Sequence, residues 1–392
     1  MRRKKIIKDG VILIIKELKI SYFRNYKDQN IIFSPGLIVI NGDNGQGKSN
    51  MLEAIYNLFF ARSFRGSKDG DMVSWGNPYY FLQGTVYIQK RLYKLEVGYE
   101  VKRKRKVISI NGKKGYSVPF TWPVVFFMPE DLELVRRGPE ERRRFIDREL
   151  SQVNSFYANC LQKYRKALIQ KNKLLKEKGC FDKSIKEQLN PWNKQLIYFG
   201  SRIIFLRAQH LSIWSELSSK NFKKLFTQDK ELQLEYSTIY SDKGIYSNSV
   251  EEIEAILEKT LEKYLKEEIK RGFSMIGPHR DDFSFFLEGK EAKRFASHGQ
   301  QRSAVVALKA AQIQFFSAKG EKPLLMVDDV FSELDESRKE NCFSLFNEAE
   351  QIFLTSTDIT KLPRMFFEKA INYISLVVEE GKVKEISGYG KN

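Results

Sequence analysis

The first third of the chain alternates apolar and polar residues over short runs, and a few of these runs are wholly apolar. Alternation with a period of two is the pattern of a half-buried β-strand, and a short apolar run is typical of a strand buried on both faces. The pattern therefore predicts strands at residues 11–18, 37–40, 84–89, 92–99, 106–110 and 124–127. Residues 1–10 are expected to form a frayed leader.

The spacing of the apolar residues changes after Pro129. From there they recur every three or four positions, which predicts helices at about residues 139–178, 192–226 and 249–269. Ser249 and Glu252 have the spacing of a capping box at the start of the third helix. The polar residues 228–248 between the last two helices are expected to form a loop.

Strand character returns in the last part of the chain. Strands are expected at residues 282–287, 324–327 and 352–355, with a helix at about 300–318 and a closing hairpin near Glu380-Gly381. The order α/β, helical, α/β indicates an outer lobe of mixed sheet with flanking helices, split by a helical insertion. The expected boundaries are residues 1–128 and 276–392 for the outer lobe and 129–275 for the helical lobe.

Charge adds a partner class to this picture. The chain of 392 residues carries 67 basic and 49 acidic residues and a formal charge of +18, which favours a polyanion such as nucleic acid as a partner. No window of about 20 apolar residues occurs, so no membrane span is expected. The three cysteines, Cys160, Cys180 and Cys342, are widely spaced and are expected to be free thiols in a reducing cytoplasm.

A phosphate-binding motif follows the strand at 37–40. The stretch from Gly42 to Ser49 fits the pattern GxxxxGK[ST], and a helical pattern begins directly after it. In such a loop the backbone N–H groups surround a β-phosphate, Lys48 neutralises the β- and γ-oxygens, and the Ser49 hydroxyl is a ligand for Mg²⁺. The residues expected to bind the nucleotide here are Gly42, Asp43, Asn44, Gly45, Gln46, Gly47, Lys48, Ser49 and Asn50.

Two adjacent acids follow the apolar run at 324–327. If that run is a central parallel strand, its end presents Asp328 as a second Mg²⁺ ligand, acting through water, and Asp329 as the group that polarises the attacking water. Acids at a helix N-terminus, favoured by the helix dipole, are the alternative interpretation. The phosphate-binding motif in the same chain favours the catalytic one.

The stretch Ser297-His298-Gly299-Gln300-Gln301-Arg302, at the start of a predicted helix, resembles the signature motif of ABC-type ATPases, where Ser-Gly-Gly-Gln is usual. A plain helix N-cap is the alternative. Residues 332–335 resemble the D-loop of that class. Thr357 stands where many ABC proteins place a histidine, and it is therefore a further residue expected to contact the nucleotide. Together these motifs predict an ABC-type P-loop ATPase head with an inserted helical lobe.

The ABC resemblance implies a composite site. In that class two heads enclose ATP, with the P-loop of one chain facing the signature of the other. The implied state is therefore an ATP-dependent homodimer in which Ser297, Gly299 and Gln300 contact the nucleotide across the interface and hydrolysis releases the partner. Lys48, Asp328, Asp329 and Ser297 are the expected catalytic residues, with ATP and Mg²⁺ as cofactors.

Several further stretches resemble one family of this class, the RecF recombination mediators. They are Phe23–Tyr26, Asn50–Ile55, Ser63–Asp69, Phe127–Leu132, Gly138-Pro139 with Arg142–Asp147, and above all Gly277-Pro278-His279-Arg280-Asp281-Asp282. The resemblance runs from about residue 16 to the end. His298, where the family often carries Gln, and residues 1–10 are the departures.

The family resemblance implies a function. Proteins of this family are cytoplasmic bacterial proteins with weak ATPase activity that dimerise on ATP and bind DNA at gaps or at junctions of single and double strands. They act with RecR and RecO in loading RecA. Their head is similar to that of SMC proteins without the long coiled coil, and the helical segment here shows no sustained heptads.

Further residues are candidates for binding. Arg24 and Arg65 are candidate cations for the nucleotide, with plain surface or packing charges as the alternative. His279 and Arg280 are expected near the nucleotide or the dimer interface, unless they only support a turn. The candidate DNA contacts are Lys102, Arg103, Lys104, Arg105, Arg142, Arg143 and Arg144, for which solvated surface is the alternative.

Two other functions remain open at this stage. A transporter ATPase subunit would need a membrane partner, and both the basic charge and Thr357 in place of the histidine argue against it. A DNA-binding scaffold that holds ATP without turning it over is the second. Asp329 has a shorter reach than the glutamate common in transporters, which is consistent with slow turnover.

Overall fold

The computed structural model describes residues 11–115, 122–177, 184–226, 230–239, 249–346, 348–364, 366–367 and 372–390. The chain divides into two compact units. The first comprises the residues up to Leu132 together with those from Lys309 onward, and the second comprises Glu133–Leu308. No described helix is both long and apolar enough to cross a membrane.

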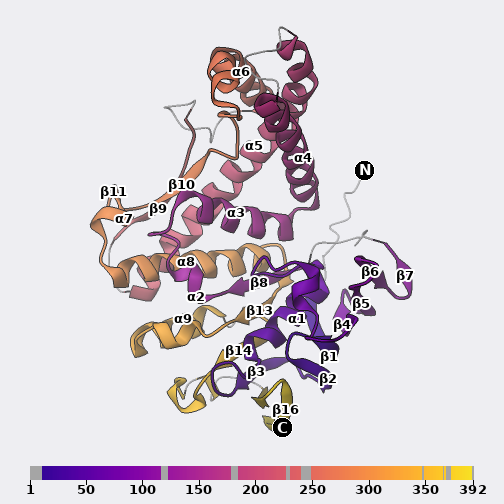
Figure 1. Ribbon diagram of the computed structural model, residues 1–392. Coiled ribbons are helices and arrows are strands. Elements are labelled where there is room, and N and C mark those ends of the chain that lie inside the picture. The colour runs from indigo at the N-terminus through magenta and orange to yellow at the C-terminus, as the bar shows by residue number, and fades with distance from the viewer. Residues whose placement is uncertain are drawn as a thin grey trace, which may run out of the picture. The chain divides into compact units, whose positions relative to one another are not determined.

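The first unit contains a largely antiparallel sheet of seven strands (Figure 1). Its strands are β1 (Val11–Phe23), β2 (Tyr26–Ile32), β4 (Tyr79–Ile88), β5 (Arg91–Glu100), β6 (Arg105–Ile110), β7 (Lys113–Lys114) and β12 (Glu321–Lys322). Buried and more exposed residues alternate along β4, as expected for a sheet that covers the core with one face. The other face of this sheet is accessible to solvent.

A second sheet of six strands completes this unit, in the order β16-β15-β3-β14-β13-β8. It is formed by β3 (Gly36–Asn41), β8 (Val124–Phe127), β13 (Leu324–Val327), β14 (Gln351–Ser356), β15 (Asn372–Glu379) and β16 (Lys382–Gly390). Five of the strands are parallel, and β16 alone is antiparallel to its neighbour. Every residue of β13 and β14 is buried, which is why β13 and the centre of β14 read as apolar runs.

Helix α1 (Lys48–Phe60) packs against strands of both sheets and is buried along most of its length. Its apolar residues share one core with the inward faces of the two sheets, so the helix that follows the phosphate-binding motif is held rigidly. Shorter elements complete the unit: η1 (Asp69–Met72), α2 (Pro129–Leu132), η3 (Val330–Glu333), α9 (Glu336–Phe346) and η4 (Ile359–Lys361).

The second unit is mainly helical (Figure 1). Its helices are α3 (Pro139–Val153), α4 (Ser155–Glu177), α5 (Ile185–Phe226), α6 (Val250–Arg271), α7 (Ala292–Phe295) and the first part of α8 (His298–Ser317). A small antiparallel sheet of β9 (Leu232–Ser237), β10 (Asp282–Leu287) and β11 (Lys290–Glu291) joins them. The capping box expected at α6 is present, with Ser249 and Glu252 bonded reciprocally.

Some expected elements differ in detail. The helix expected at 139–178 is two helices, because Asn154 interrupts it and its Oδ1 accepts the backbone N–H of Tyr157 at 3.0 Å as the cap of α4. Helix α5 starts at Ile185, earlier than the expected start at about residue 192, and Pro191 lies inside it. The stretch expected to be a loop contains β9, which pairs with β10. Residues 1–10 and Cys180 lie outside the described residues.

The two units also place one boundary differently from the expected domains. The first boundary is close to the expected one, but the second lies at 308/309 rather than at 275/276. Residues 276–308 go with the helices because β10 pairs with β9 and Arg142 of α3 forms a two-point ion pair with Asp282. Contacts of this kind join residues that are far apart in the sequence. A domain boundary predicted from local sequence patterns cannot detect them.

Candidate nucleotide site

The loop between β3 and α1 has the backbone geometry of a phosphate-binding loop. Gly42, Gly45 and Gly47 have positive φ angles of 149°, 81° and 120°. A Cβ atom on Gly42 would lie 2.3 Å from the carbonyl oxygen of Val378, and one on Gly47 would lie 2.7 Å from Asn25 Nδ2. Glycine is therefore required at both positions by the backbone angle and by the space.

The loop is fastened on its outer side by the hairpin between β15 and β16. Gly381 donates its N–H to the carbonyl oxygen of Gln46 at 2.9 Å, and Glu380 donates its N–H to Gln46 Oε1 at 2.7 Å. Asn25 Nδ2 donates to the same Gln46 carbonyl at 2.8 Å. The shape of the loop thus depends on segments from both ends of the described chain.

Lys48 is buried and folds back over its own loop. Its Nζ donates to the carbonyl oxygens of Gly42 and Asp43 at 2.6 and 2.9 Å. Burial lowers the pKa of the Lys48 ammonium, and the carboxylates of Asp329 and Asp328 oppose that shift. The charge is held close to the position where the motif places phosphate oxygens.

Asp328 and Ser49 meet beyond the carboxyl ends of β13 and β3, the two strands that flank β14. Ser49 Oγ donates to Asp328 Oδ1 at 2.7 Å, and Thr355 Oγ1 donates to the same oxygen at 2.9 Å. Burial raises the pKa of Asp328, and these two bonds oppose the rise. The backbone N–H of Asp329 donates to Thr355 Oγ1 at 2.8 Å, so Thr355 orients both acids.

Asp329 has a different environment from its neighbour. Its φ of 47° is left-handed, and it caps η3. Burial is also the main cause that raises its pKa, and proximity to Asp328 adds to the rise. Ser332, in the stretch that resembles a D-loop, donates its hydroxyl to the Asp329 carbonyl oxygen at 2.7 Å.

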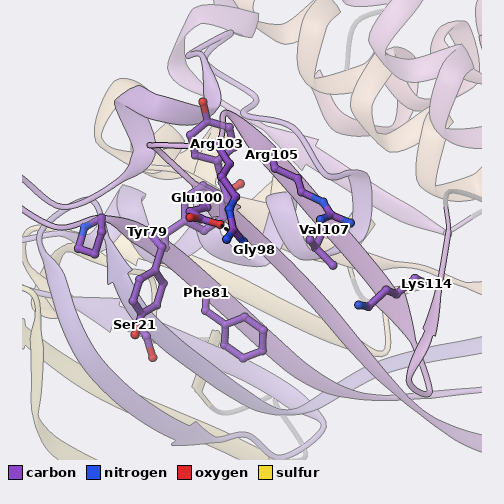
Figure 2. A pocket seen from close by; sticks show the side chains of 12 residues that line it. Ser21, Tyr79, Phe81, Gly98, Glu100, Arg103, Arg105, Val107 and Lys114 are labelled. Carbon is purple, nitrogen blue, oxygen red and sulfur yellow. Dashed lines mark hydrogen bonds and ion pairs between the residues drawn. The ribbon is translucent and has the colours of Figure 1, made fainter.

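These residues surround one hollow of about 250 Å³. It is lined by Asn44, Gly45, Gly47, Lys48, Ser49, Asn50, Arg65 and Asp329. A larger hollow of about 600 Å³ lies on the seven-stranded sheet and contains none of the motif residues (Figure 2). Chemistry rather than size therefore identifies the smaller hollow as the candidate nucleotide site.

The donor set fits Mg²⁺ held in part by phosphate. Ser49 and Asp328 supply a hydroxyl and a carboxylate oxygen 2.7 Å apart, and magnesium sites of this class take their remaining ligands from phosphate and water. Among the described residues, no cluster of three His, Cys, Asp or Glu side chains forms a separate metal site.

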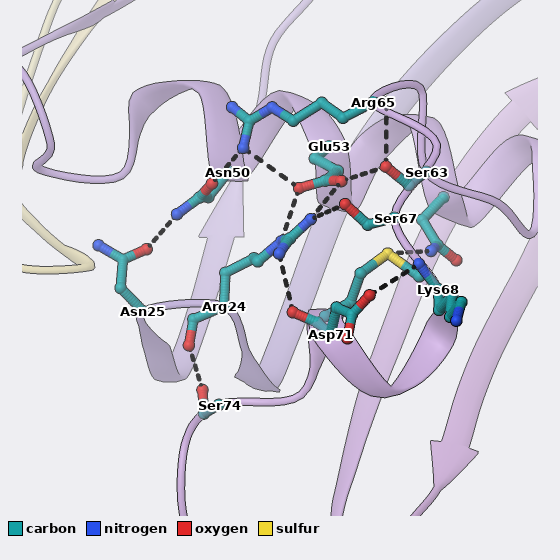
Figure 3. A network of polar contacts seen from close by, with 12 residues as sticks. Arg24, Asn25, Asn50, Glu53, Ser63, Arg65, Ser67, Lys68, Asp71 and Ser74 are labelled. Carbon is teal, nitrogen blue, oxygen red and sulfur yellow. Dashed lines mark hydrogen bonds and ion pairs between the residues drawn. The ribbon is translucent and has the colours of Figure 1, made fainter. Parts of the chain in front are cut away.

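Arg24 does not line this hollow, contrary to expectation. Figure 3 shows its guanidinium facing Glu53, to which Nε and Nη2 donate at 2.8 and 2.9 Å. Nη2 also donates to Ser67 Oγ, and Nη1 donates to the Asp71 carbonyl oxygen. All the guanidinium nitrogens of Arg24 are thus engaged in joining β1 to α1 and η1.

Arg65 does line the hollow. Its Nη1 donates to Asn50 Oδ1 at 3.0 Å and lies 3.6 Å from Glu53 Oε2 (Figure 3). Asn50 in turn donates to Asn25 Oδ1 at 2.9 Å. Arg65 is partly exposed, so its guanidinium can exchange these neutral and ionic partners for a phosphate.

Sequence reasoning did not identify Glu53 and Thr355. Glu53 is fully buried on α1 and is the common partner of Arg24, Arg65 and Ser63. A carboxylate five residues after the phosphate-binding lysine, within the mainly apolar stretch Met51–Phe60, is the signal that could have found it. Thr355 carries no comparable signal, because one hydroxyl in an apolar strand fits many roles. Thr357, which was expected at this site, lies half-buried just beyond the end of β14.

The residues that resemble the ABC signature lie in the second unit. Ser297 and Gln300 form a reciprocal cap on α8, in which Ser297 Oγ accepts the N–H of Gln300 and Gln300 Oε1 accepts the N–H of Ser297. The carbonyl oxygen of Gly299 accepts a bond from Ser303 Oγ. His298 Nδ1 lies 3.4 Å from Arg136 Nη1. The cap satisfies two backbone N–H groups at the start of the helix.

The turn at 277–282 is packed inside the second unit. His279 Nε2 donates to the Ser274 carbonyl oxygen at 3.1 Å, and its Nδ1 accepts from the Tyr164 hydroxyl at 2.7 Å. Burial lowers the pKa of His279 to about 4, so the ring is neutral at pH 7. Arg280 also donates to Ser274 and lies over the Phe273 ring. The contacts favour the structural role for this turn.

The candidate DNA residues fall into two groups. Lys102, Arg103, Lys104 and Arg105 are all exposed at the turn between β5 and β6. Arg142 is buried and uses Nε and Nη2 on Asp282, so its side chain is not exposed for contact with DNA in this structure. Arg143 is half-buried and donates to the Asp281 carbonyl oxygen, and Arg144 is exposed beside Glu140.

Comparison with known proteins identifies relatives along nearly the whole chain. A family model described as "AAA domain" matches residues 17–369. The "DNA replication and repair protein RecF" of Desulfitobacterium hafniense (strain DSM 10664 / DCB-2) is 36% identical over 376 residues, covering 95% of this chain and 99% of its own. The protein of the same name from Ligilactobacillus salivarius (strain UCC118) is 35% identical over 381 residues, covering 96% and 99%.

Solved structures give the same result. One, described as "Structure of the recombination mediator protein RecF-ATPrS in RecFOR pathway", superposes with a TM-score of 0.85 at 32% identity, covering 95% of this chain and 98% of its own. An SMC head domain from Pyrococcus furiosus, at 16% identity and a TM-score of 0.54, shares the fold alone. The ABC-type head fold is thereby confirmed, and the chain belongs to the RecF family of DNA replication and repair proteins.

Proposed function

We propose that this protein binds ATP with Mg²⁺ in the hollow beside α1 and hydrolyses it slowly. The observation that carries the proposal is the convergence of Lys48, the Ser49–Asp328 pair and Asp329 on one hollow at the carboxyl ends of parallel strands. Relatives described as RecF-ATP and RecF-ATPrS have the same fold at 30 and 32% identity, which supports the assignment of the nucleotide.

Each residue has a proposed task. Backbone N–H groups of the loop bind phosphate oxygens together with Lys48 and Arg65, and Ser49 and Asp328 hold Mg²⁺. Bound Mg²⁺ neutralises charge on the β- and γ-phosphates. Asp329 polarises the attacking water, and its short side chain limits how closely it approaches that water. Slow turnover follows from this limited reach.

A second copy completes the site in this proposal. Ser297, Gly299 and Gln300 begin a helix, where N–H groups and a hydroxyl can face a γ-phosphate. The partner copy would supply these groups, so ATP would hold two copies together and its hydrolysis would release them. The reciprocal hydrogen bonds between Ser297 and Gln300 would keep the first turn of α8 in a fixed conformation for that contact.

The nucleotide cycle would serve DNA repair. The basic charge and the exposed cations at residues 102–105 support binding to the phosphate backbone without sequence preference. We place the protein in the cytoplasm, where bacterial DNA lies, as an ATP-switched mediator at gaps and strand junctions. In this role it acts with RecR and RecO to help load RecA.

Light scattering of the full chain tests the switch. Solution mass is measured without nucleotide, with ADP, and with ATP and Mg²⁺, for the parent protein and for Ser297→Arg. We expect ATP to double the mass of the parent, whereas Ser297→Arg stays monomeric. Ser237→Arg, on an exposed strand end of the same unit, is the matched control. If ATP does not change the solution mass of the parent, the dimer switch is wrong. The remaining function is then a scaffold that holds ATP without turning it over.

A further inference from the structure

The larger hollow of about 600 Å³ lies on the solvent side of the seven-stranded sheet, away from every ATP-binding motif (Figure 2). Strands β4, β5 and β6 form its floor, and the β5–β6 turn and β7 supply part of its rim. Its lining consists of Ser21, Pro78, Tyr79, Tyr80, Phe81, Gly98, Tyr99, Glu100, Arg103, Arg105, Val107 and Lys114. The nucleotide cycle uses none of these residues.

Strand register explains why the sheet is hollow here. Phe81 pairs with Gly98, and Gly98 pairs with Val107, so these three residues form one row across the outer face. Glycine contributes no side chain to the middle of the row, and the space above it is open. Gly98 does not need its conformational freedom, because its φ lies outside the left-handed region and an added Cβ would sit 3.4 Å from Phe81 Cδ2.

Aromatic side chains border this opening. Tyr79 is 40% exposed and meets the ring of Tyr22 edge to face, with the ring centroids 5.3 Å apart. Phe81 lies in the hollow beside it (Figure 2). Trp75, four residues before Tyr79 but outside the lining of the hollow, is 99% exposed. Tyr79 and Phe81 thus present aromatic surface at the opening.

Cations border the aromatic floor on the side of the β5–β6 turn, β6 and β7. Arg103, Arg105 and Lys114 line the hollow, and Lys102 and Lys104 are exposed on the same turn. Glu100 is the one acid among the lining residues, and it lies 3.5 Å from Arg103. The surroundings are therefore strongly positive, with flat apolar surface at the centre.

We propose that this hollow binds unpaired bases of single-stranded DNA, stacked on Tyr79 and Phe81, while the cations of the turn and Lys114 hold the neighbouring phosphates. The inference rests on the DNA binding proposed above and assigns the contact with unpaired bases to this site. Stacking on aromatic side chains tolerates any base, whereas the paired bases of a duplex are not free to enter. The site would favour gaps and strand ends over intact duplex.

An acidic peptide would match the same cations. A peptide that adds to a sheet uses the backbone of an edge strand, but this hollow lies on the face of β4, β5 and β6, where the floor strand β5 is paired on both sides. Planar bases match a flat aromatic face bordered by positive charge, so the observations favour nucleic acid. Unchanged DNA binding in the test below would instead point to the peptide.

Fluorescence anisotropy of the full chain with ATP and Mg²⁺ provides the test. The probes are a labelled thymidine oligonucleotide, a strand of the same length in which most bases are replaced by abasic sites, and a blunt duplex. The variants are Gly98→Val, which fills the floor without removing a contact, and Tyr79→Ala, which removes a stacking surface. Leu92→Ala, 56% exposed on the same strand but outside the hollow, is the control.

We expect both variants to bind the thymidine strand about tenfold more weakly, with duplex binding and ATP hydrolysis unchanged. The abasic strand should bind weakly to every protein and respond to neither variant. An equal loss on duplex, or no loss on the thymidine strand, would overturn the inference while leaving the proposed function intact. If the parent binds none of the probes, the proposed function fails as well. Thermal melting confirms that each variant is folded.

Discussion

Ser49 and Asp328 are 279 positions apart in the chain, yet the hydroxyl of the first donates to the carboxylate of the second at 2.7 Å. Ser49 lies in the first turn of α1 and Asp328 follows β13, so the bond closes the base of the nucleotide hollow where two parallel strands end. Thr355 joins them by donating to the same carboxylate oxygen. The following predictions test this arrangement and the buried contacts around it.

Replacing Thr355 with Val should weaken the magnesium site. The substitution removes the donor to Asp328 and leaves the N–H of Asp329 without its acceptor, at a cost of about 1–3 kcal/mol in the free energy of unfolding. Without that bond the pKa of Asp328 rises further, so hydrolysis should need more Mg²⁺. Titrating Mg²⁺ at saturating ATP measures this. Thr355→Ser keeps the hydroxyl and should behave like the parent.

Replacing Asp329 with Asn should separate binding from hydrolysis. The amide keeps the size of the side chain but cannot accept the proton of the attacking water, so turnover should fall by about 10²–10⁴-fold. ATP binding should persist, and light scattering should show an ATP-bound dimer that no longer dissociates with time. A dimer that decays as fast as in the parent would remove Asp329 from the catalytic step.

Glu53→Gln should destabilise the first unit. Glu53 is fully buried and bonded through both oxygens to Arg24, and breaking such a pair by neutralising one partner costs about 3–5 kcal/mol. Urea unfolding should show this loss, together with weaker ATP binding because Arg65 loses its neighbour. Glu100→Gln, with a partly exposed carboxylate on the antiparallel sheet, should change the free energy of unfolding by less than about 1 kcal/mol.

The lowered pKa of His279 predicts how the free energy of unfolding depends on pH. Its folded pKa of about 4 lies below the ordinary value of 6.5, so between these values the unfolded chain binds a proton that the folded chain does not. Keeping the ring neutral contributes up to about 3 kcal/mol to the free energy of unfolding. This contribution is complete above about pH 6.5 and is lost as the pH falls toward 4.

Urea unfolding across pH 4–7 measures this slope. His279→Gln should flatten it whatever the variant does to stability at pH 7. His210→Gln, which replaces a partly exposed histidine on α5, is the matched control. Equal slopes for His279→Gln and the parent would show that the ring is not held neutral.

The nucleotide loop and the two acids were predictable because each is a short contiguous motif next to an apolar strand. The roles of Arg24 and Arg142 were not predictable, because a sequence shows a charge but not the distant carboxylate that pairs with it. Glu53 lies 29 residues from Arg24, and Asp282 lies 140 residues from Arg142. The outer lobe was recognised as split, but the pairing of β9 with β10 depends on register between distant segments.

The order of strands in the six-stranded sheet has a consequence for synthesis on the ribosome. Strand β3, which leads into the nucleotide loop, pairs with β14 on one side and β15 on the other, and both are made about 300 residues later. At roughly 5–20 residues per second, an apolar strand with two open edges waits about 15–60 seconds for its neighbours. During that interval the nascent chain carries an aggregation-prone segment that it cannot yet cover, so chaperone protection at this stage would determine the yield of active protein.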